Sequence, residues 1–491
     1  MPRAERPFRN GLAALLLALL LAGPLSAAQV VLVNGDAAGT GFSDTRPADP
    51  GAGANGAATL GGQRLAVLQR AAEIWGAVLD SPVPIRVGIR MLALTCGSQG
   101  TTLARAGPVA LASNFPNAPR PNTAYHIAHA NALARVDLDS RDDVVAEFNL
   151  AVDSGCSTGV SGWWYGLDPA QPVPADRIAL LPVALHELAH GLGFSAQTDL
   201  ATGQFPGSSP TLWSHYLYDL QRGRHWRALS AAERAQSARD DPWLVWSGRA
   251  VSRGGADVLL GEPVLALDGI RGGPELVGGL ALAQFGPAWP GLAGSARVVA
   301  VDDGVAGAGE PLGTLTDGCE FPFRNGSRLA GQVALLDRGY CPFVDKVRNA
   351  QQHGAVGVIV ANQADGPPPV MGGSAADITI PAVGVSREQG QALRLRLLRA
   401  RLETGFGRSS TPSGTRQGCV RMFAPSTLQT GSSVSHFHSE AQPALLMAPS
   451  ISRSLFDDLD LTLDLFRDLG WPLLVPLPPI PPVDCPVSPL P

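Results

Sequence analysis

The stretch VALHELAHGLGFSAQTD, from Val183 to Asp199, decides how the rest of the chain is interpreted. Its apolar residues predict a buried helix, and the two glycines that follow the second histidine would end that helix by permitting backbone angles that other residues avoid. His186 and His190 are four residues apart, so their imidazoles would project from one face of the helix towards a single ion. The stretch therefore predicts a metal site.

Zn²⁺ is the ion that this pair of histidines favours. Glu187 lies next to the first histidine and can take the proton of a water molecule as that water attacks a peptide carbonyl, without binding the metal itself. The alternative is a chance HExxH pattern on an ordinary core helix. Three specified residues in a chain with only 9 histidines make this alternative rare.

A catalytic zinc site normally has three protein ligands and one open position, so one ligand is missing from this helix. In the long form of the motif the third ligand stands six residues after His190, where this chain has Ala196. A thermolysin-type site would instead use a glutamate on a later helix, and the first one is Glu233. The histidines that remain as candidates are His215, His225, His353, His436 and His438. We assign His126 and His129 to the surface or to a structural role.

Composition limits the class of protein. A length of 491 residues predicts two to four domains, and 45% hydrophobic residues with Gly 57 and Pro 42 are typical of a loop-rich globular protein. The formal net charge is −5, and Lys346 is the only lysine among 37 basic residues. Because the arginines form no run or stripe, the sequence argues against a nucleic-acid partner.

The first 28 residues predict a secretory signal peptide. Arginines at positions 3, 6 and 9 precede the apolar run GLAALLLALLLAG, and the small residues Ser26 and Ala28 suit a cleavage site before Gln29. A membrane anchor is the alternative, but about a dozen apolar residues fall short of the ~20 needed to cross a bilayer. We expect an extracellular or periplasmic protein with no membrane span after cleavage, whose six cysteines form disulfides.

The pattern along the chain predicts an α+β fold. Strands are expected at 29–36, 83–94 and 142–152, with helices at 61–81 and 177–194, which together suggest one mixed sheet beside the helix of the histidines. A Gly-rich and Val-rich region at about 249–408 alternates strands and helices and reads as a self-contained domain. The proline-rich end of the chain cannot form a helix interior.

The motifs HELAHGLGF, SHFH and LLMAP together resemble the leishmanolysin-like branch of the metzincin zinc proteases. In that branch the third histidine follows an insertion and precedes a Met-turn, a turn whose methionine lies beneath the metal. The resemblance implies that His436 is the third ligand and that Met447 is the methionine of the turn, with His438 as a nearby rival for the ligand. Phe437 replaces the tryptophan of the family motif.

A second resemblance covers the insertion. The segment LAGQVALLDRGYCPFVDKVRNAQQHGAVGVIVAN and the later ITIPAVGVS look like a protease-associated (PA) domain, a non-catalytic module. The resemblance implies a disulfide between Cys319 and Cys341. The other four cysteines allow three pairings, of which Cys96 with Cys156 and Cys419 with Cys485 fits the domain division best.

These observations predict a secreted zinc metalloendopeptidase, a hydrolase that acts on proteins or peptides, with the metal held by His186, His190 and His436 and with Glu187 as general base. The rival is a secreted PA-domain binding protein with an inactive zincin scaffold. The oligomeric state is left open. The expected parts are a signal peptide at 1–28, catalytic segments at 29–250 and 421–473, an inserted region at 251–420 with its PA core at about 296–402, and a Pro-rich tail at 474–491.

Overall fold

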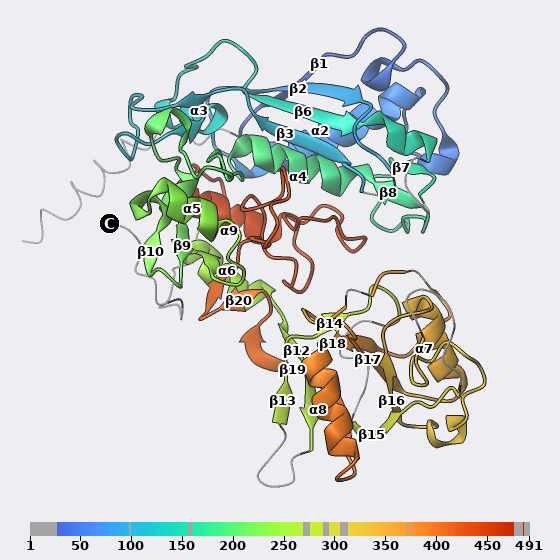
Figure 1. Cartoon of the computed structure of the whole chain (residues 1–491). Coiled ribbons are helices and arrows are strands. Elements are labelled where there is room, and N and C mark those ends of the chain that lie inside the picture. The colour runs from blue at the N-terminus through green and yellow to red at the C-terminus, as the bar shows by residue number, and fades with distance from the viewer. Residues whose placement is uncertain are drawn as a thin grey trace, which may run out of the picture. The chain divides into compact units, whose positions relative to one another are not determined.

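The computed structural model describes residues 27–475 and Cys485, apart from residues 98–99, 156–159, 269–274, 288–293, 305–312, 370 and 374. The chain divides into two compact units (Figure 1). Unit 1 contains Met1–Leu259 and Gly414–Pro491, and unit 2 is the intervening segment Leu260–Ser413. The predicted signal peptide lies almost entirely outside the described residues, as does most of the Pro-rich tail.

A four-stranded mixed sheet forms one layer of unit 1, as the sequence predicts. Its order is β1-β2-β6-β3. The first three of these strands are parallel and the last, at the edge, is antiparallel to β6. Alternation along β2 places Ile85, Val87 and Ile89 in the core and Arg86 in solvent, which is the pattern of a strand with one covered face. The four strands are β1 (Val30–Asn34), β2 (Ile85–Leu92), β3 (Ala104–Pro108) and β6 (Val144–Asn149).

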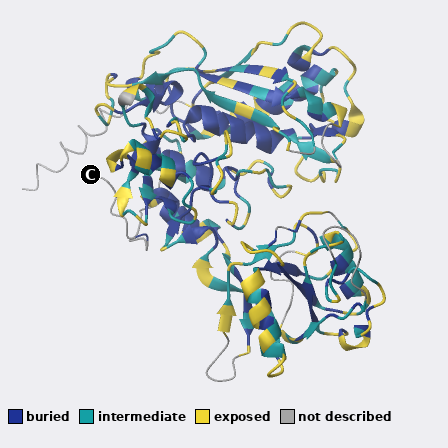
Figure 2. Ribbon diagram, viewed as in Figure 1, coloured by how far each residue is buried: buried dark blue, intermediate teal, exposed yellow. Residues whose placement is uncertain are grey.

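Two helices pack beside this sheet and against each other, α2 (Leu60–Val78) and α4 (Leu180–Leu192). The α2 helix begins at a Thr59 cap, whose side chain accepts a hydrogen bond from the Gly62 amide. In Figure 2, α4 is buried along its whole length. The helix that carries HExxH is therefore a central element of the core of unit 1.

The rest of unit 1 consists of short elements that share this core. A second, three-stranded sheet has the order β10-β9-β11, and α6 packs against the C-terminal helix α9. The helices are α3 (Ile127–Ala134), α5 (Ala231–Ser237), α6 (Arg249–Val258) and α9 (Asp460–Leu469). The strands are β4 (Leu111–Ala112), β5 (Tyr125–His126), β7 (Gly162–Trp164), β8 (Arg177–Ala179), β9 (Leu217–Asp219), β10 (Arg224–His225), β11 (Leu244–Trp246), β20 (Thr415–Arg416) and β21 (Cys419–Val420).

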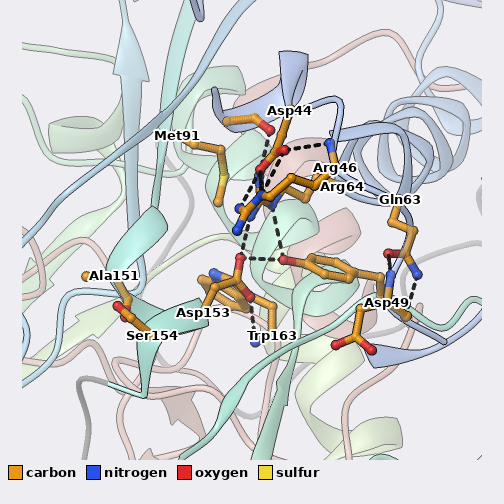
Figure 3. A network of polar contacts seen from close by, with 12 residues as sticks. Asp44, Arg46, Asp49, Gln63, Arg64, Met91, Ala151, Asp153, Ser154 and Trp163 are labelled. Atoms are coloured by element: carbon orange, nitrogen blue, oxygen red, sulfur yellow. Dashed lines mark hydrogen bonds and ion pairs between the residues drawn. The ribbon is translucent and has the colours of Figure 1, made fainter. Parts of the chain in front are cut away.

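A buried arginine ties α2 to the loops at the end of the sheet (Figure 3). The Arg64 side chain is fully buried, and its guanidinium lies 2.7 Å from the Asp153 carboxylate and 3.5 Å from that of Asp44. It also donates to the Gly41 carbonyl and to the Tyr165 hydroxyl. Since a buried charge is tolerated only when it is paired, this network fixes the loops relative to the helix.

Unit 2 is built on an eight-stranded sheet of order β13-β12-β19-β15-β16-β17-β18-β14, in which β15 to β18 run parallel. Apolar residues of α7 cover one face and those of α8 the other, which gives the unit two small cores. The helices are α7 (Phe343–Gln352) and α8 (Arg387–Leu397). The strands are β12 (Gly261–Leu267), β13 (Glu275–Val277), β14 (Ala281–Leu282), β15 (Ser295–Ala300), β16 (Val333–Asp337), β17 (Gly357–Ala361), β18 (Ala382–Val385) and β19 (Glu403–Pro412).

The first and last strands of unit 2 pair with each other, with Gly261 opposite Pro412. The chain therefore enters and leaves the unit at one place, as an insertion requires. The range 251–420 predicted for the inserted region is wider than unit 2. The difference arises because α6 packs on α9 and because β21 contacts β11, which places the two ends of that range in unit 1.

Two disulfides join described cysteines, Cys319 to Cys341 and Cys419 to Cys485, and both pairings agree with the prediction. The second joins Cys485 to Cys419 at the start of β21. Cys96 is also disulfide-bonded, but its predicted partner Cys156 lies outside the described residues. Within the described part of the chain, no helix has the length and apolar character needed to cross a bilayer.

Candidate metal centre

The α4 helix lies unusually close to the sheet at its C-terminal end. An added Cβ at Gly191 would lie only 2.2 Å from Val144 Cγ1 on β6, so no larger residue fits there without movement. Gly193 follows with φ of 139°, and its amide donates to the Ala189 and His190 carbonyls. These two glycines therefore set how closely the helix packs and where the chain leaves it.

Ala196 stands where the long motif would have its third ligand, and its backbone makes a contact that positions another histidine. Its backbone amide donates to Ser435 Oγ at 3.0 Å, so the turn after α4 is fastened to the residue that precedes His436. The segment around His436 is held in turn by hydrogen bonds to the strand-like stretch at Phe423. A distant part of the chain thus supplies a third imidazole at this place.

The structure brings together the three predicted ligands. The Nε2 atom of His186 lies 3.1 Å from that of His190 and 3.1 Å from that of His436. One ring nitrogen from each residue lies within 4.8 Å of the others, and all three side chains are buried. Three buried imidazoles thus converge on one point.

Hydrogen bonds to carbonyl groups determine which ring nitrogen carries the proton. The Nδ1 atoms of His186, His190 and His436 contact the carbonyl oxygens of Leu446, Phe194 and Ser432 at 2.7, 2.6 and 2.7 Å. A carbonyl oxygen can only accept, so each Nδ1 must donate, and each neutral ring then has a lone pair on Nε2. Three lone pairs that face one another repel unless a cation lies between them.

Burial also keeps these rings neutral. It lowers the pKa of His186 to about 4 and that of His436 to about 3, with the neighbouring imidazole adding to the second effect. The pKa of His190 is lowered in the same direction by burial and by the other two rings. Neutral imidazole is the form that binds a metal ion.

Glu187 directly follows His186 in sequence but does not belong to the group of three histidines that converges. Its side chain is buried, and its Oε2 atom has no hydrogen-bond partner among the described residues. Burial raises the pKa of this carboxyl group to about 8. An unsatisfied buried carboxyl group one residue from a metal-binding histidine is typical of an acid–base group that awaits its substrate or solvent partner.

Two residues near the third histidine support the cluster. Met447 is fully buried, and its carbonyl accepts a hydrogen bond from the Phe437 amide at 2.9 Å. Asp460, at the start of α9, accepts a hydrogen bond from the Leu446 amide, and the carbonyl of Leu446 receives the Nδ1 proton of His186. The sequence did not single out Asp460, because a carboxylate at a helix start looks like an ordinary cap.

The other candidates for the third ligand lie elsewhere. Glu233, the ligand of the thermolysin-type alternative, forms the capping box of α5 with Ser230 and an ion pair with Arg224, and it does not belong to the converging group. His438 Nε2 lies 2.9 Å from the Arg421 guanidinium, and this histidine does not belong to the group either. His215 contacts Thr123, His225 contacts Ser247, and His353 accepts from the Phe323 amide in unit 2.

Of the two roles that the sequence allows for His126 and His129, the surface and a structural one, the structural role holds, because both side chains are buried. His126 Nε2 lies 2.9 Å from Ser195 Oγ, just beyond the end of α4, and His129 stacks on Trp471 with ring centroids 4.7 Å apart. Their structural role is thus the packing of α3 against α4 and the C-terminal helix. Periodicity alone could not reveal this, since α3 is short and rich in alanine.

Comparisons with known proteins identify part of unit 2. Residues 296–393 match the PA domain family. A probable lipoprotein aminopeptidase, LpqL of Mycobacterium tuberculosis, is 42% identical over 69 residues, and an ER degradation-enhancing alpha-mannosidase-like protein of Xenopus laevis is 32% identical over 124 residues. These matches cover 13% and 23% of this chain and 13% of each relative.

Among solved structures, the zinc aminopeptidase BSAP from Bacillus subtilis resembles 33% of this chain and 36% of its own, with 20% identity and a TM-score of 0.21. So low a score carries no argument about the metal centre. The chain spans about an eighth of the curated relatives named above, one of which is described as mannosidase-like, so their activities do not transfer with the match. The comparisons thus establish one family relationship: residues 296–393 form a PA domain.

Proposed function

We propose that this protein is a zinc-dependent endopeptidase in which His186, His190 and His436 bind the metal and Glu187 is the general base. The observation that carries the proposal is the convergence of three Nε2 lone pairs on one point, with the unpaired buried carboxyl group of Glu187 one residue after the first of these histidines. A core histidine cluster without a metal would pair these nitrogens with donors. Here each donor is directed away, towards a backbone carbonyl.

The donor set favours zinc over other common ions. Ca²⁺ and Mg²⁺ prefer oxygen ligands, whereas three neutral imidazoles are a typical set of protein ligands for catalytic Zn²⁺, which keeps a fourth position for water or substrate. The carbonyl contacts of the three Nδ1 atoms support the same assignment, because they fix the orientation of each ring. When bound, zinc would supply Lewis-acid polarisation of a carbonyl and would acidify a water molecule.

The chain's own residues account for the remaining requirements of peptide hydrolysis. Glu187 stands next to the first ligand on a rigid buried helix and can accept the proton of the attacking water, then return it to the leaving amine. Burial of the cluster limits access of bulk water, which strengthens electrostatic interactions in the site. The hydrogen bond between Ala196 and Ser435 holds the two halves of the ligand set together.

We assign the catalytic unit to the leishmanolysin-like metzincins. The support is the order of motifs, with HExxH ahead of an insertion and His436 eleven residues before Met447, together with the burial of that methionine. The inserted PA domain fits the same assignment as a module for contact with substrates or partners. The described disulfides favour an oxidising compartment, in agreement with export through the predicted signal peptide.

The rival function is a PA-domain binding protein with an inactive scaffold. An intact Glu187 argues against it, because a site that only binds metal has no need of a buried carboxylate without a partner. The relative LpqL raises a narrower alternative, since it is described as a probable lipoprotein aminopeptidase. An exopeptidase would require a free substrate N-terminus.

One experiment separates these functions. The zinc-loaded full chain is incubated with unfolded casein and with peptides of one sequence that carry either a free or an acetylated N-terminus, each with and without a chelator. We expect chelator-sensitive cleavage inside both peptides, which Glu187→Gln abolishes. Cleavage of only the free peptide would indicate an aminopeptidase. If no substrate is cleaved in a chelator-sensitive way, the result would favour the PA-domain binding protein with an inactive scaffold.

A further inference from the structure

Unit 2 contains a cluster of carboxylates that lies outside the histidine site. Asp303 follows strand β15, and Asp317 and Glu320 lie in the loop before β16. One oxygen of each residue lies within 4.8 Å of the other two. Two of the three side chains are buried and Glu320 is half-buried, so the cluster lies just beneath the surface with one member open to solvent.

The hydrogen bonds of the surrounding residues leave part of this cluster unsatisfied. Asp303 is 4% exposed, and its Oδ2 accepts from the Gly318 amide, whereas its Oδ1 is buried without a hydrogen-bond partner among the described residues. The same holds for the buried Oε2 atom of Glu320. Buried carboxylate oxygens without donors are costly, and such atoms in a native structure usually have an ion or ordered water as partner.

Lys346 is not the partner of these two unpaired oxygens. It is fully buried, and its Nζ donates to the Asp317 carbonyl at 2.8 Å and contacts Cys319 Sγ at 3.1 Å. Its distance to Asp317 Oδ1 is 3.9 Å, and neither unpaired oxygen is among its contacts. Three carboxylates against one ammonium group leave a formal charge of −2.

Burial and mutual repulsion raise the pKa values of Asp303 and Glu320 in this cluster. Burial raises the pKa of Asp303 to about 6, and the neighbouring carboxylates of Asp317 and Glu320 add to the rise although the Gly318 amide opposes it. The pKa of Glu320 is raised by burial and by Asp317. A divalent cation among the three oxygens would neutralise the charge that remains.

We propose that unit 2 binds one Ca²⁺ ion through the carboxylates of Asp303, Asp317 and Glu320. The site lies in unit 2, so it is independent of the proposed zinc centre and of peptidase activity. Its ligands come from two stretches of chain, the residues after β15 and the loop before β16, and Cys319 of the Cys319–Cys341 disulfide lies between two of them in sequence. Bound Ca²⁺ would therefore fasten the end of β15 to the loop before β16.

The chemistry of the donors selects calcium. Carboxylate oxygens are hard ligands, and Ca²⁺ binds them at about 2.3–2.6 Å in flexible geometry. Two oxygens on one such ion can be no more than about 5 Å apart, a limit that the three oxygens satisfy because they lie within 4.8 Å of one another. Mg²⁺ demands shorter and more regular contacts, and Zn²⁺ favours nitrogen and sulfur ligands.

Equilibrium dialysis of the full, zinc-loaded chain against ⁴⁵Ca²⁺ tests the proposal directly, because the label reports calcium alone. The variants are Asp303→Asn and Glu320→Gln, which remove one negative charge each with little change in shape. Asp365→Asn is the matched control, since this carboxylate is exposed in the same unit and pairs with Arg387. Bound zinc is counted in parallel and should be equal in all four proteins.

We expect one Ca²⁺ per chain in the wild type and in the control, with a Kd in the range of about 10⁻⁴ to 10⁻³ M typical of extracellular calcium modules. Each of the two variants should raise the Kd at least tenfold. Because Glu320 is half-buried, Glu320→Gln keeps the test valid even if Asp303→Asn fails to fold. Absence of saturable binding in the wild type, or wild-type affinity in Glu320→Gln, would overturn the proposal.

Discussion

The close contact between α4 and β6 gives a quantitative test of how the ligand helix is positioned. In Gly191→Ala the new methyl carbon would begin 2.2 Å from Val144 Cγ1 and 2.7 Å from Cγ2. Carbon atoms in contact normally lie about 3.5–4.0 Å apart. The deficit exceeds 1 Å, and Val144 is itself fully buried, so the helix must move. Overpacking of this kind costs about 1–3 kcal/mol, more than the gain of up to about 1 kcal/mol from replacing glycine in a helix.

A double-mutant cycle separates this contact from general damage to the core. Val144→Ala alone leaves a cavity, at a cost of about 1–3 kcal/mol, but it removes both methyl groups that meet the new side chain. The double variant should therefore be more stable than the sum of the single effects by about 1–2 kcal/mol. The rescue is partial, because Val144 Cβ would still lie 3.0 Å away.

Chemical denaturation of the metal-free protein, followed by tryptophan fluorescence, measures these changes in the free energy of unfolding. Eight of the nine tryptophans lie outside residues 260–413, so the signal reports mainly on unit 1. A Gly191→Ala variant as stable as the wild type would refute the reasoning. Strict additivity of the two substitutions would refute it as well.

Three further predictions concern other residues of unit 1. Glu187→Gln should keep one zinc per chain, because this residue is no ligand, while kcat for casein falls by about 10²–10⁴; equal activity would exclude it as the base. Asp460→Ala should weaken zinc binding about tenfold, since the Leu446 amide loses its acceptor and the carbonyl that orients His186 is released; an unchanged zinc affinity in a competition assay would contradict this role. Hydrogen bonds from Arg46 hold the pKa of Asp44 at about 2, so the unfolded state binds more protons than the folded state between pH 4 and 2. Wild-type stability should therefore fall by about 1–2 kcal/mol more than that of Asp44→Asn as the pH drops through this window, a figure that allows for screening at the exposed Arg46; parallel stability curves would refute it.

The sequence was sufficient for the parts of the site that depend on local spacing. The four-residue separation of His186 and His190 on an apolar run predicts both the helix and the shared direction of the two rings, and the structure agrees. Strand alternation likewise predicts the mixed sheet beside this helix. These features depend on residues that are close in sequence, so the periodicity of the sequence predicts them.

The third histidine could not be found from spacing, because it lies 246 residues after His190 and is brought back by tertiary contacts. Only the resemblance of the SHFH and LLMAP motifs to a known family indicated His436. The bond from Ala196 to Ser435, which makes the long-range arrangement possible, involves a backbone amide and leaves no trace in the sequence. The support from Asp460 is hidden for the same reason.

For His126 and His129 the sequence left the surface and a structural role open. Histidine is often found at the surface, and an alanine-rich segment offers no apolar stripe that would indicate burial. Their burial depends on Trp471 and on the turn after α4, both distant in sequence. For titratable residues in short elements such as β5 and α3, tertiary packing thus determines whether the side chain is buried, and the sequence pattern does not predict it.

The most direct test of the account is the zinc affinity of His436→Ala compared with His438→Ala. Both substitutions remove a buried imidazole from the same short segment, but only the first removes a ring that faces His186. We predict that His436→Ala weakens zinc binding at least 100-fold, which is more than the loss of a residue that only hydrogen-bonds to a ligand would cause. The zinc affinity of His438→Ala should stay within about tenfold of that of the wild type. Equal affinities for His436→Ala and the wild type would contradict the proposed three-histidine centre.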